Sequence, residues 1–180
     1  MIDFTPVEPK HFALLLEWLQ RPHVARWFAF WMPPTEEGTI ELWTSMLEGR
    51  VPQRGYLVVV DGAPMGYVES SRVSEDPDWA RALGVDGEAV AADVFIADLD
   101  RIGQGLGPRV VRRFYLRMMD ETGLDVGIID PEVDNLSAIR AYEKAGFGFL
   151  REVDSGQPRG REHIMRAARA DLELALDGSS

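Results

Sequence analysis

The stretch Asp93-Val94-Phe95-Ile96, followed by Arg101-Ile102-Gly103-Gln104-Gly105-Leu106-Gly107 and Pro108-Arg109-Val110-Val111, decides the fold. An apolar run, three glycines at alternate positions and a segment of helical periodicity predict a strand, a tight loop and a helix. Glycine permits positive φ and a close ligand approach, so successive N–H groups can converge on an anion at the helix N-terminus. The loop therefore indicates either a phosphate site or a plain turn.

Periodicity and turn residues predict the remaining elements. Before the loop we expect a strand over 2–4, a helix over 9–21, a short aromatic-rich segment over 23–34, a helix opened by residues 35–37, a hairpin of strands 56–60 and 65–71 around a turn at 61–64, a polar loop over 74–88 and a strand over 90–96. After the loop we expect a helix that begins at Pro108 and is closed by Gly123, a strand over 126–129, a helix over 136–145 between Asn135 and Gly146, strands over 147–153 and 162–167, and a tail over 171–180 that frays.

Strands alternate with helices in the middle of the chain, and hairpins lie on both sides, so we expect a mixed sheet of α/β or α+β class. A chain of 180 residues without a low-complexity linker is expected to form a single domain.

Composition limits the class of protein. Hydrophobic residues make up 46% and aromatic residues 9%, as in an ordinary globular protein. No apolar run approaches membrane-spanning length, and residues 1–6 lack the features of a secretion signal, so we expect a cytoplasmic protein without a membrane partner. The absence of cysteine excludes a cysteine nucleophile, and three histidines offer little material for a metal site, so we expect no metal.

The charge balance points to a cationic partner. Lys and Arg number 19 against 30 Asp and Glu, which gives a formal charge of −11. Such a field repels nucleic acid and attracts polycationic small molecules. The alternative is that the acidic excess only maintains solubility.

A second motif covers residues 130–147, from Asp130-Pro131-Glu132 through Asn135 to Tyr142-Glu143-Lys144-Ala145-Gly146-Phe147. Together with the glycine loop, it resembles the acetyl-CoA-binding half of the GNAT N-acetyltransferase superfamily. Residues 14–27 and 62–67, Asp78-Trp79 and Asp93 are similar to the aminoglycoside 6'-N-acetyltransferases and their siderophore-pathway relatives.

The resemblance implies the GNAT fold, in which a central mixed, mostly antiparallel sheet is flanked by helices and acetyl-CoA lies in a cleft between central strands. It implies a single domain over 1–180, with acceptor-side elements at about 1–90, an acetyl-CoA-binding core at about 90–150 and C-terminal strands at 151–170.

The resemblance also implies an acetyl-CoA site. Its expected residues are Val94, Phe95, Ile96, Arg101, Ile102, Gly103, Gln104, Gly105, Leu106, Gly107, Pro108, Arg109, Asn135, Ala138, Tyr142 and Lys144. The family has Arg or Gln at the position of Ile102, which puts a side-chain contact from that position in doubt but leaves the backbone cradle. Asn135 can instead be only a helix cap, and Arg109 and Lys144 only solvated residues.

Two residues are expected to be catalytic. Asp93 matches the acidic residue that serves the family as base or electrostatic anchor for the acceptor amine, and a carboxylate can accept a proton directly or through water. Tyr142 matches the tyrosine that protonates the departing thiolate, for which a phenol has a suitable pKa. The alternatives are that Asp93 only ends a strand and that Tyr142 is a core aromatic.

The acceptor side is expected to combine aromatic and acidic residues. Trp27, Phe28 and Trp31 can form a wall for a sugar ring, with Trp79 similar, or they can pack a core. Asp78 and Asp130 match acidic residues that hold the cationic substrate in the family, or they belong to ordinary turns.

These features predict an acetyl-CoA-dependent aminoglycoside N-acetyltransferase that confers antibiotic resistance, acts by direct attack of the amine and accepts substrates such as kanamycin or kasugamycin. It is expected to be a monomer or a homodimer. The alternatives are a siderophore-pathway hydroxylysine N-acyltransferase, a protein or peptide N-acetyltransferase, and a non-catalytic acyl-CoA-binding module. Ala91 and Ala92 disfavour the siderophore alternative, because a histidine is expected there.

Overall fold

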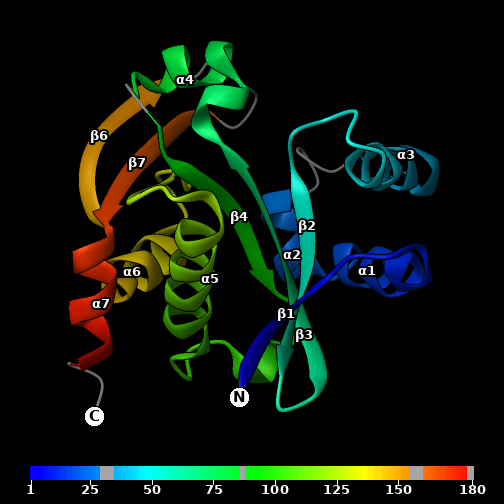
Figure 1. The fold of residues 1–180 in the computed structure, drawn as a ribbon. Helices are drawn as coiled ribbons and strands as arrows, with labels where there is room; N and C mark the ends of the chain where they lie inside the picture. The colour runs from blue at the N-terminus through cyan, green and yellow to red at the C-terminus, as the bar shows by residue number, and fades with distance from the viewer. Residues whose placement is uncertain (29–34, 86–87, 155–159, 178–180) are drawn as a thin grey trace. The chain divides into compact units, whose positions relative to one another are not determined.

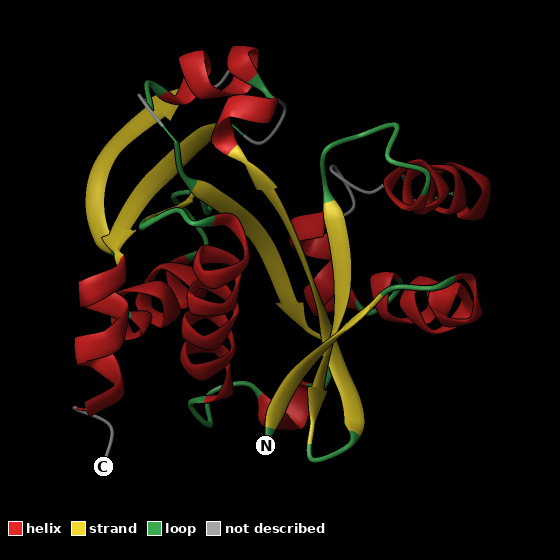
Figure 2. Cartoon of the chain, viewed as in Figure 1, coloured by secondary structure: helices red, strands yellow, loops and turns green. Residues whose placement is uncertain are grey.

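The computed structural model describes residues 1–28, 35–85, 88–154 and 160–177. Within these ranges it contains one seven-stranded sheet of order β1-β2-β3-β4-β5-β7-β6 (Figure 2). The strands are β1 Ile2–Pro6, β2 Arg54–Val60, β3 Ala63–Arg72, β4 Val90–Ile96, β5 Val126–Ile129, β6 Gly148–Asp154 and β7 Arg161–Ala168. β4 and β5 are parallel, whereas the pairs β1–β2, β2–β3, β5–β7 and β6–β7 are antiparallel. The predicted mixed, mostly antiparallel sheet is therefore confirmed.

Seven α-helices lie in the described ranges (Figure 1). They are α1 Phe12–Leu19, α2 Pro22–Phe28, α3 Glu36–Leu47, α4 Pro77–Leu83, α5 Leu106–Thr122, α6 Leu136–Ala145 and α7 Arg169–Asp177. Short 3₁₀ segments cover Pro9–His11, Val73–Glu75 and Leu99–Arg101. In the described part of the chain, no helix is long and apolar enough to cross a bilayer.

The chain forms two compact units. The first comprises Met1–Ser70 and Asp93–Ile102, and the second comprises Ser71–Ala92 and the described residues from Gly103 onward. The expectation of a single domain over 1–180 stays a prediction.

The first unit holds α1, α2, α3 and the antiparallel strands β1 and β2 with most of β3 (Figure 1). Its core is an aromatic-rich cluster that includes Leu15, Trp18, Val24, Phe28, Trp43, Tyr67 and Phe95. Thr35 caps α3 as predicted, since its Oγ1 accepts a hydrogen bond from the Gly38 N–H at 3.3 Å.

The predicted hairpin is confirmed, but its turn is shorter than the expected 61–64. Asp61 and Gly62 have φ of 51° and 84° and form the turn alone. Two consecutive positive φ angles match the twist of the flanking strands, so pairing resumes at once at Ala63 opposite Val60. Pro64 is consequently a residue of β3, next to a register shift between Val58 and Val59.

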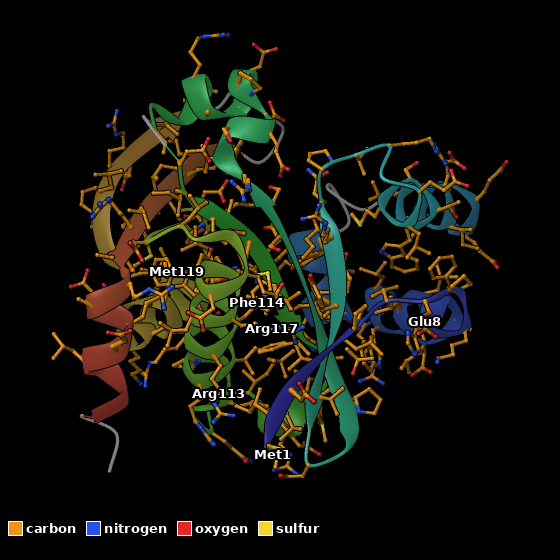
Figure 3. The ribbon with its side chains drawn as sticks, in the orientation of Figure 1. Met1, Glu8, Arg113, Phe114, Arg117 and Met119 are labelled. Atoms are coloured by element: carbon orange, nitrogen blue, oxygen red, sulfur yellow. The ribbon has the colours of Figure 1, made fainter. Side chains whose placement is uncertain are left out.

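In the second unit, α5, α6 and α7 contact one another, and β6 and β7 form a curved hairpin (Figure 1). Phe114 and Met119 lie on the buried face of α5, whereas Arg113 is exposed (Figure 3). A smaller core cluster consists of Val73, Ala89, Ala91, Ile128 and Ile164. The predicted bounds of β4, β5 and α6 agree with the structure.

The prediction of an uninterrupted polar loop over 74–88 was wrong, because the segment contains α4. Asp76 caps this helix by accepting a hydrogen bond from the Trp79 N–H at 2.9 Å, and Pro77 is its first residue. Gly84, with φ of 62°, ends it in the left-handed conformation. This is the usual arrangement of a capped helix with proline at its start and glycine after its end.

The prediction of a frayed tail was also wrong for the described residues, because they form α7. Leu172 is fully buried on this helix. The Asp171 carboxylate accepts a hydrogen bond from the Ala168 N–H at 2.9 Å, and Arg169 forms ion pairs with Asp120 and Asp125. Burial of an apolar side chain and these polar contacts explain why the segment is ordered.

Candidate functional site

The glycine loop enters α5 through two left-handed residues. Gly103 and Gly105 have φ of 82° and 77°, and Gly105 is the N-cap of α5. Among the described residues, no heavy atom beyond the chain neighbours lies within 4 Å of the Cβ position of either glycine, so glycine is favoured there by backbone conformation and not by space. Gly107 instead has its Cβ position 3.9 Å from Ala141 Cβ, which brings α5 close to α6.

The start of α5 supplies unpaired backbone donors. The first N–H groups of a helix have no intrahelical partner, and the helix dipole makes this end positive. The prediction that Pro108 is the first residue of this helix was wrong. The helix already begins at Leu106, so Pro108 is its third residue. A proline in this first turn still removes only an N–H that the helix itself does not use. The N–H groups of Gly105, Leu106 and Gly107 are thus available for an anion.

The side chains around this loop differ in exposure. Arg101, Ile102, Gly103, Gln104, Gly105 and Arg109 are exposed, Gly107 and Pro108 are half-buried, and Leu106 is buried. Arg101 ends the short 3₁₀ segment that precedes the loop. Of the two residues that precede Gly103, Arg101 therefore has an exposed cationic side chain and Ile102 an exposed apolar one.

The predicted residues of α6 include its cap. Asn135 Oδ1 accepts hydrogen bonds from the Ala138 N–H at 3.2 Å and from Ser137 Oγ at 3.0 Å, so Asn135 caps the helix whatever its role toward a ligand. Tyr142 is buried, with its ring centroid 6.4 Å from that of Phe147. The Lys144 side chain is exposed.

Sequence reasoning missed Arg112, a buried residue that connects α5 to the end of α6. Its Nη2 donates to the Lys144 carbonyl at 2.8 Å and its Nε to the Ala145 carbonyl at 3.4 Å. Burial lowers the pKa of this guanidinium. Arg112 thus bonds the last carbonyls of the helix that carries Tyr142.

Two side chains from residues 21–23 contact backbone carbonyls at and just after the end of β4. His23 Nε2 lies 3.2 Å from the Ile96 carbonyl oxygen, and Arg21 Nη1 donates to the Ala97 carbonyl at 2.8 Å. Val94 and Ile96 are half-buried. Phe95 is a core residue, so a ligand contact predicted for it would come from its backbone.

β4 and β5 pair over a short length. Their parallel register joins Val90 to Gly127 and Ala91 to Ile128, and both pairs precede Asp93. Asp93 is half-buried.

The predicted aromatic residues lie mainly in cores. The Phe28 ring meets that of Phe95 edge-on at 4.9 Å, and half-buried Trp27 packs at the border of the same cluster with the Arg26 guanidinium 4.6 Å from its ring centroid. Half-buried Trp79 packs against the core of the second unit. Trp31 lies outside the described residues.

The predicted acidic residues differ in their surroundings. Asp78 is exposed on α4 and pairs with Arg81 at 2.7 Å. Asp130 follows β5 directly and is buried, with 9% of its surface exposed. Asp130 is therefore a buried acid at the end of β5, whereas Asp78 is a solvent-exposed acid in the first turn of α4.

A buried acid–phenol pair on β3 was not predicted. The Tyr67 hydroxyl donates to Glu69 Oε2 at 2.6 Å, and the two residues are 0% and 1% exposed. Burial raises the pKa of Tyr67 well above its ordinary value, and the charge and hydrogen bond of Glu69 and the charge of Asp93 raise it further, although Trp43 opposes them. The sequence held a signal for this pair, since Tyr67 and Glu69 are two residues apart in a strand and so share a face.

The mixed sheet, with a glycine loop between β4 and the N-terminus of α5, agrees with the acyltransferase fold that the sequence resemblance implied. The family model described as acetyltransferase (GNAT) domain matches residues 8–155, and the chain belongs to this family.

Its relatives include aminoglycoside-modifying enzymes. The aminoglycoside N(6')-acetyltransferase type 1 of Klebsiella pneumoniae is 30% identical over 136 residues, which cover 75% of this chain and 68% of that protein. A solved structure of AAC(6')-Ib with coenzyme A and kanamycin has a TM-score of 0.84 at 27% identity and covers 97% of this chain and 98% of its own. Another, which contains acetyl-CoA, has a TM-score of 0.84 at 27% identity, with 96% of each chain covered.

Proposed function

We propose that this protein transfers the acetyl group of acetyl-CoA to an amine of a cationic aminoglycoside, the 6'-amine where the substrate has one. The observation that carries the proposal is the half-buried carboxylate of Asp93, in the same unit as buried Glu69 and an aromatic cluster. Carboxylates beside aromatic rings suit a charged amino sugar. The similarity to AAC(6')-Ib structures supports the choice of substrate class.

In the proposed reaction, Asp93 accepts a proton from the substrate ammonium, directly or through water. The neutral amine then attacks the thioester carbonyl, whose developing charge is stabilised by backbone of residues 94–96. Tyr142 donates a proton to the departing thiolate. The reaction needs no covalent enzyme intermediate, because amine and thioester react directly once both are bound.

The proposal assigns the acyl donor to the second unit. The N–H groups of Gly105, Leu106 and Gly107 bind its pyrophosphate at the positive end of α5. Arg101, Arg109 and Lys144 are exposed cations that can meet further phosphate oxygens. Trp27, Asp78, Trp79 and Asp130 complete the proposed acceptor side.

Further parts of the proposal come from the sequence. Kasugamycin is included with kanamycin among the acceptors to be tested. A cytoplasmic location, a contribution to antibiotic resistance, and a monomer or homodimer as the active form are also predicted.

The experiment is a direct assay of the purified protein. Acetyl-CoA consumption is followed by the release of free thiol in the presence of kanamycin, kasugamycin and other aminoglycosides. Turnover is expected on at least one of them, and no turnover on any would overturn the proposed function. Asp93→Asn should lower kcat by about 10²-fold or more with little change in thermal stability. An unchanged rate would remove Asp93 from the mechanism.

A further inference from the structure

The Glu69 carboxylate is held from one side by the Tyr67 phenol. The Tyr67 hydroxyl donates to Glu69 Oε2 at 2.6 Å and lies 3.7 Å from Met46 Sδ. On β2, Gly55 is directly opposite Glu69, and a Cβ at Gly55 would lie 2.8 Å from the Tyr67 hydroxyl oxygen. The absence of a side chain at Gly55 therefore makes room for the phenol that reaches Glu69.

On its other side Glu69 is opposite Asp93. The Ala97 N–H donates to the Met65 carbonyl at 2.8 Å, and the rings of Tyr67 and Phe95 lie 5.6 Å apart. Met65 is therefore opposite Ala97, and Tyr67 is opposite Phe95, as in an antiparallel pair of strands. The next pair in this register is Glu69 and Asp93. Their side chains lie on the same face as those of Tyr67 and Phe95, since residues two apart in a strand share a face.

The far end of the ladder supports this register. The Val73 N–H donates to the Ala89 carbonyl at 2.9 Å, which is the pairing that the register of Met65 and Ala97 predicts eight residues further along, or four steps of two. No net bulge therefore lies between the two ends. Side chains directly opposite each other in an antiparallel pair have Cβ atoms roughly 4.5 to 5.5 Å apart, so the two carboxylates are neighbours.

The described neighbours of Glu69 include the titratable Tyr67. α3 contributes Trp43 and Met46, and α2 contributes Phe28, to the cluster that contains Tyr67. His23 from α2 is titratable and lies at the Ile96 end of β4. A hydrogen bond from a phenol favours the ionised form of Glu69, and an ionised neighbour disfavours loss of the proton from Asp93.

We propose that Glu69 is a positioning residue of the acceptor side, which acts through its negative charge to make Asp93 a stronger base toward the substrate ammonium. The inference rests on the proposed function only in that Asp93 serves as the base. The charge of Glu69 also doubles the negative charge offered to the ammonium. Tyr67 and Gly55 belong to the same arrangement, because the Tyr67 phenol donates to Glu69 and Gly55 leaves room for that phenol.

The test measures the basicity of Asp93 in the free protein. The side-chain carboxyl resonances of Asp93 and Glu69 are titrated by ¹³C NMR in wild type, Glu69→Gln, Tyr67→Phe and Gly55→Ala. Glu37→Gln is the control, since Glu37 is an exposed acid in the first turn of α3 and its replacement removes the same charge. Thermal unfolding of each variant identifies any that does not fold.

In Glu69→Gln the titration midpoint of Asp93 is expected to fall by about one pH unit or more, because the neighbouring charge is gone. Tyr67→Phe and Gly55→Ala should shift it in the same direction by less, and Glu37→Gln should leave it unchanged. The acid limb of kcat/KM should move to lower pH together with the NMR midpoint. At high pH, kcat of Glu69→Gln should fall about threefold to tenfold, since general-base efficiency follows basicity.

An Asp93 midpoint that is the same in wild type, Glu69→Gln and Tyr67→Phe would overturn the inference, even if wild type acetylates aminoglycosides. If Glu69→Gln does not fold, the midpoint in Tyr67→Phe decides. A shifted midpoint in a protein that acetylates no aminoglycoside would support the pairing while it overturns the proposed function. The two failures are thus distinguishable.

Discussion

Replacement of Gly105 by alanine tests whether the loop conformation binds the acyl donor. Gly105 has φ of 77°, and its Cβ position has no neighbour within 4 Å, so alanine introduces backbone strain but no clash. A left-handed conformation costs a residue with a side chain about 1 to 2 kcal/mol. Rotation of residue 105 to negative φ relieves this strain, so Gly105→Ala is expected to turn the first amides of α5 from the phosphate.

The size of the expected loss of affinity follows from the strength of hydrogen bonds. An N–H bond to a charged oxygen contributes about 1.5 to 3 kcal/mol, and about 1.4 kcal/mol changes a dissociation constant tenfold. Loss of one such bond in Gly105→Ala therefore predicts coenzyme A binding that is weaker by about tenfold or more. Isothermal titration calorimetry measures this constant, and urea unfolding measures the accompanying loss of stability.

Gly62 provides the matched control. It has φ of 84° and no neighbour within 4 Å of its Cβ position, but it belongs to the turn between β2 and β3. Gly62→Ala should lose a similar amount of stability and bind coenzyme A as wild type does. Equal binding by both variants and wild type would refute the phosphate-binding role of the loop.

Three further predictions concern other parts of the chain. Tyr142→Phe should lower kcat about 10²-fold without raising KM for acetyl-CoA, in steady-state assays, and an unaltered kcat would leave Tyr142 as a core aromatic. Leu172→Ala should lower the free energy of unfolding by about 2 to 5 kcal/mol in urea titrations because Leu172 is fully buried, whereas Leu174→Ala, at a residue 70% exposed, should change it by less than about 0.5 kcal/mol; equal losses would contradict the packing of α7. The raised pKa of Tyr67 implies stability that is complete below the ordinary tyrosine pKa and is lost as pH rises above it, because only the unfolded state then ionises. Above about pH 10, wild type should therefore lose about 1.4 kcal/mol per pH unit more than Tyr67→Phe, and parallel pH profiles would contradict this.

The sequence predicted elements whose signals are local. β4 is a continuous apolar run, and α6 lies between an Asn cap and a left-handed Gly146, so both were found with their bounds. The wrong predictions of a polar loop over 74–88 and of a frayed tail have physical reasons. The order of α7 depends on burial of Leu172, which is a tertiary contact. α4 has a local signal in Asp76, Pro77 and Gly84 that was missed because the segment is polar and only seven residues long.

The candidate site shows the same division. The three glycines and Asp93 could be identified from the sequence because their spacing matches a family pattern. Glu69 could not, because its proposed role depends on the strand register that places it opposite Asp93 and on its hydrogen bond with the Tyr67 phenol. Arg112 was missed for a similar reason, since an arginine in a helix is usually solvated and only its contacts with α6 explain its burial.

The most direct measurement is the rate of acetyl transfer from acetyl-CoA to kanamycin by wild-type protein and by Asp93→Asn, with the acetylated position determined by mass spectrometry and NMR. We predict turnover by wild type, acetylation of one amine, and a kcat at least about 10²-fold lower for Asp93→Asn. Absence of acetylation across the aminoglycoside panel, or an equal rate for the two proteins, would contradict the account.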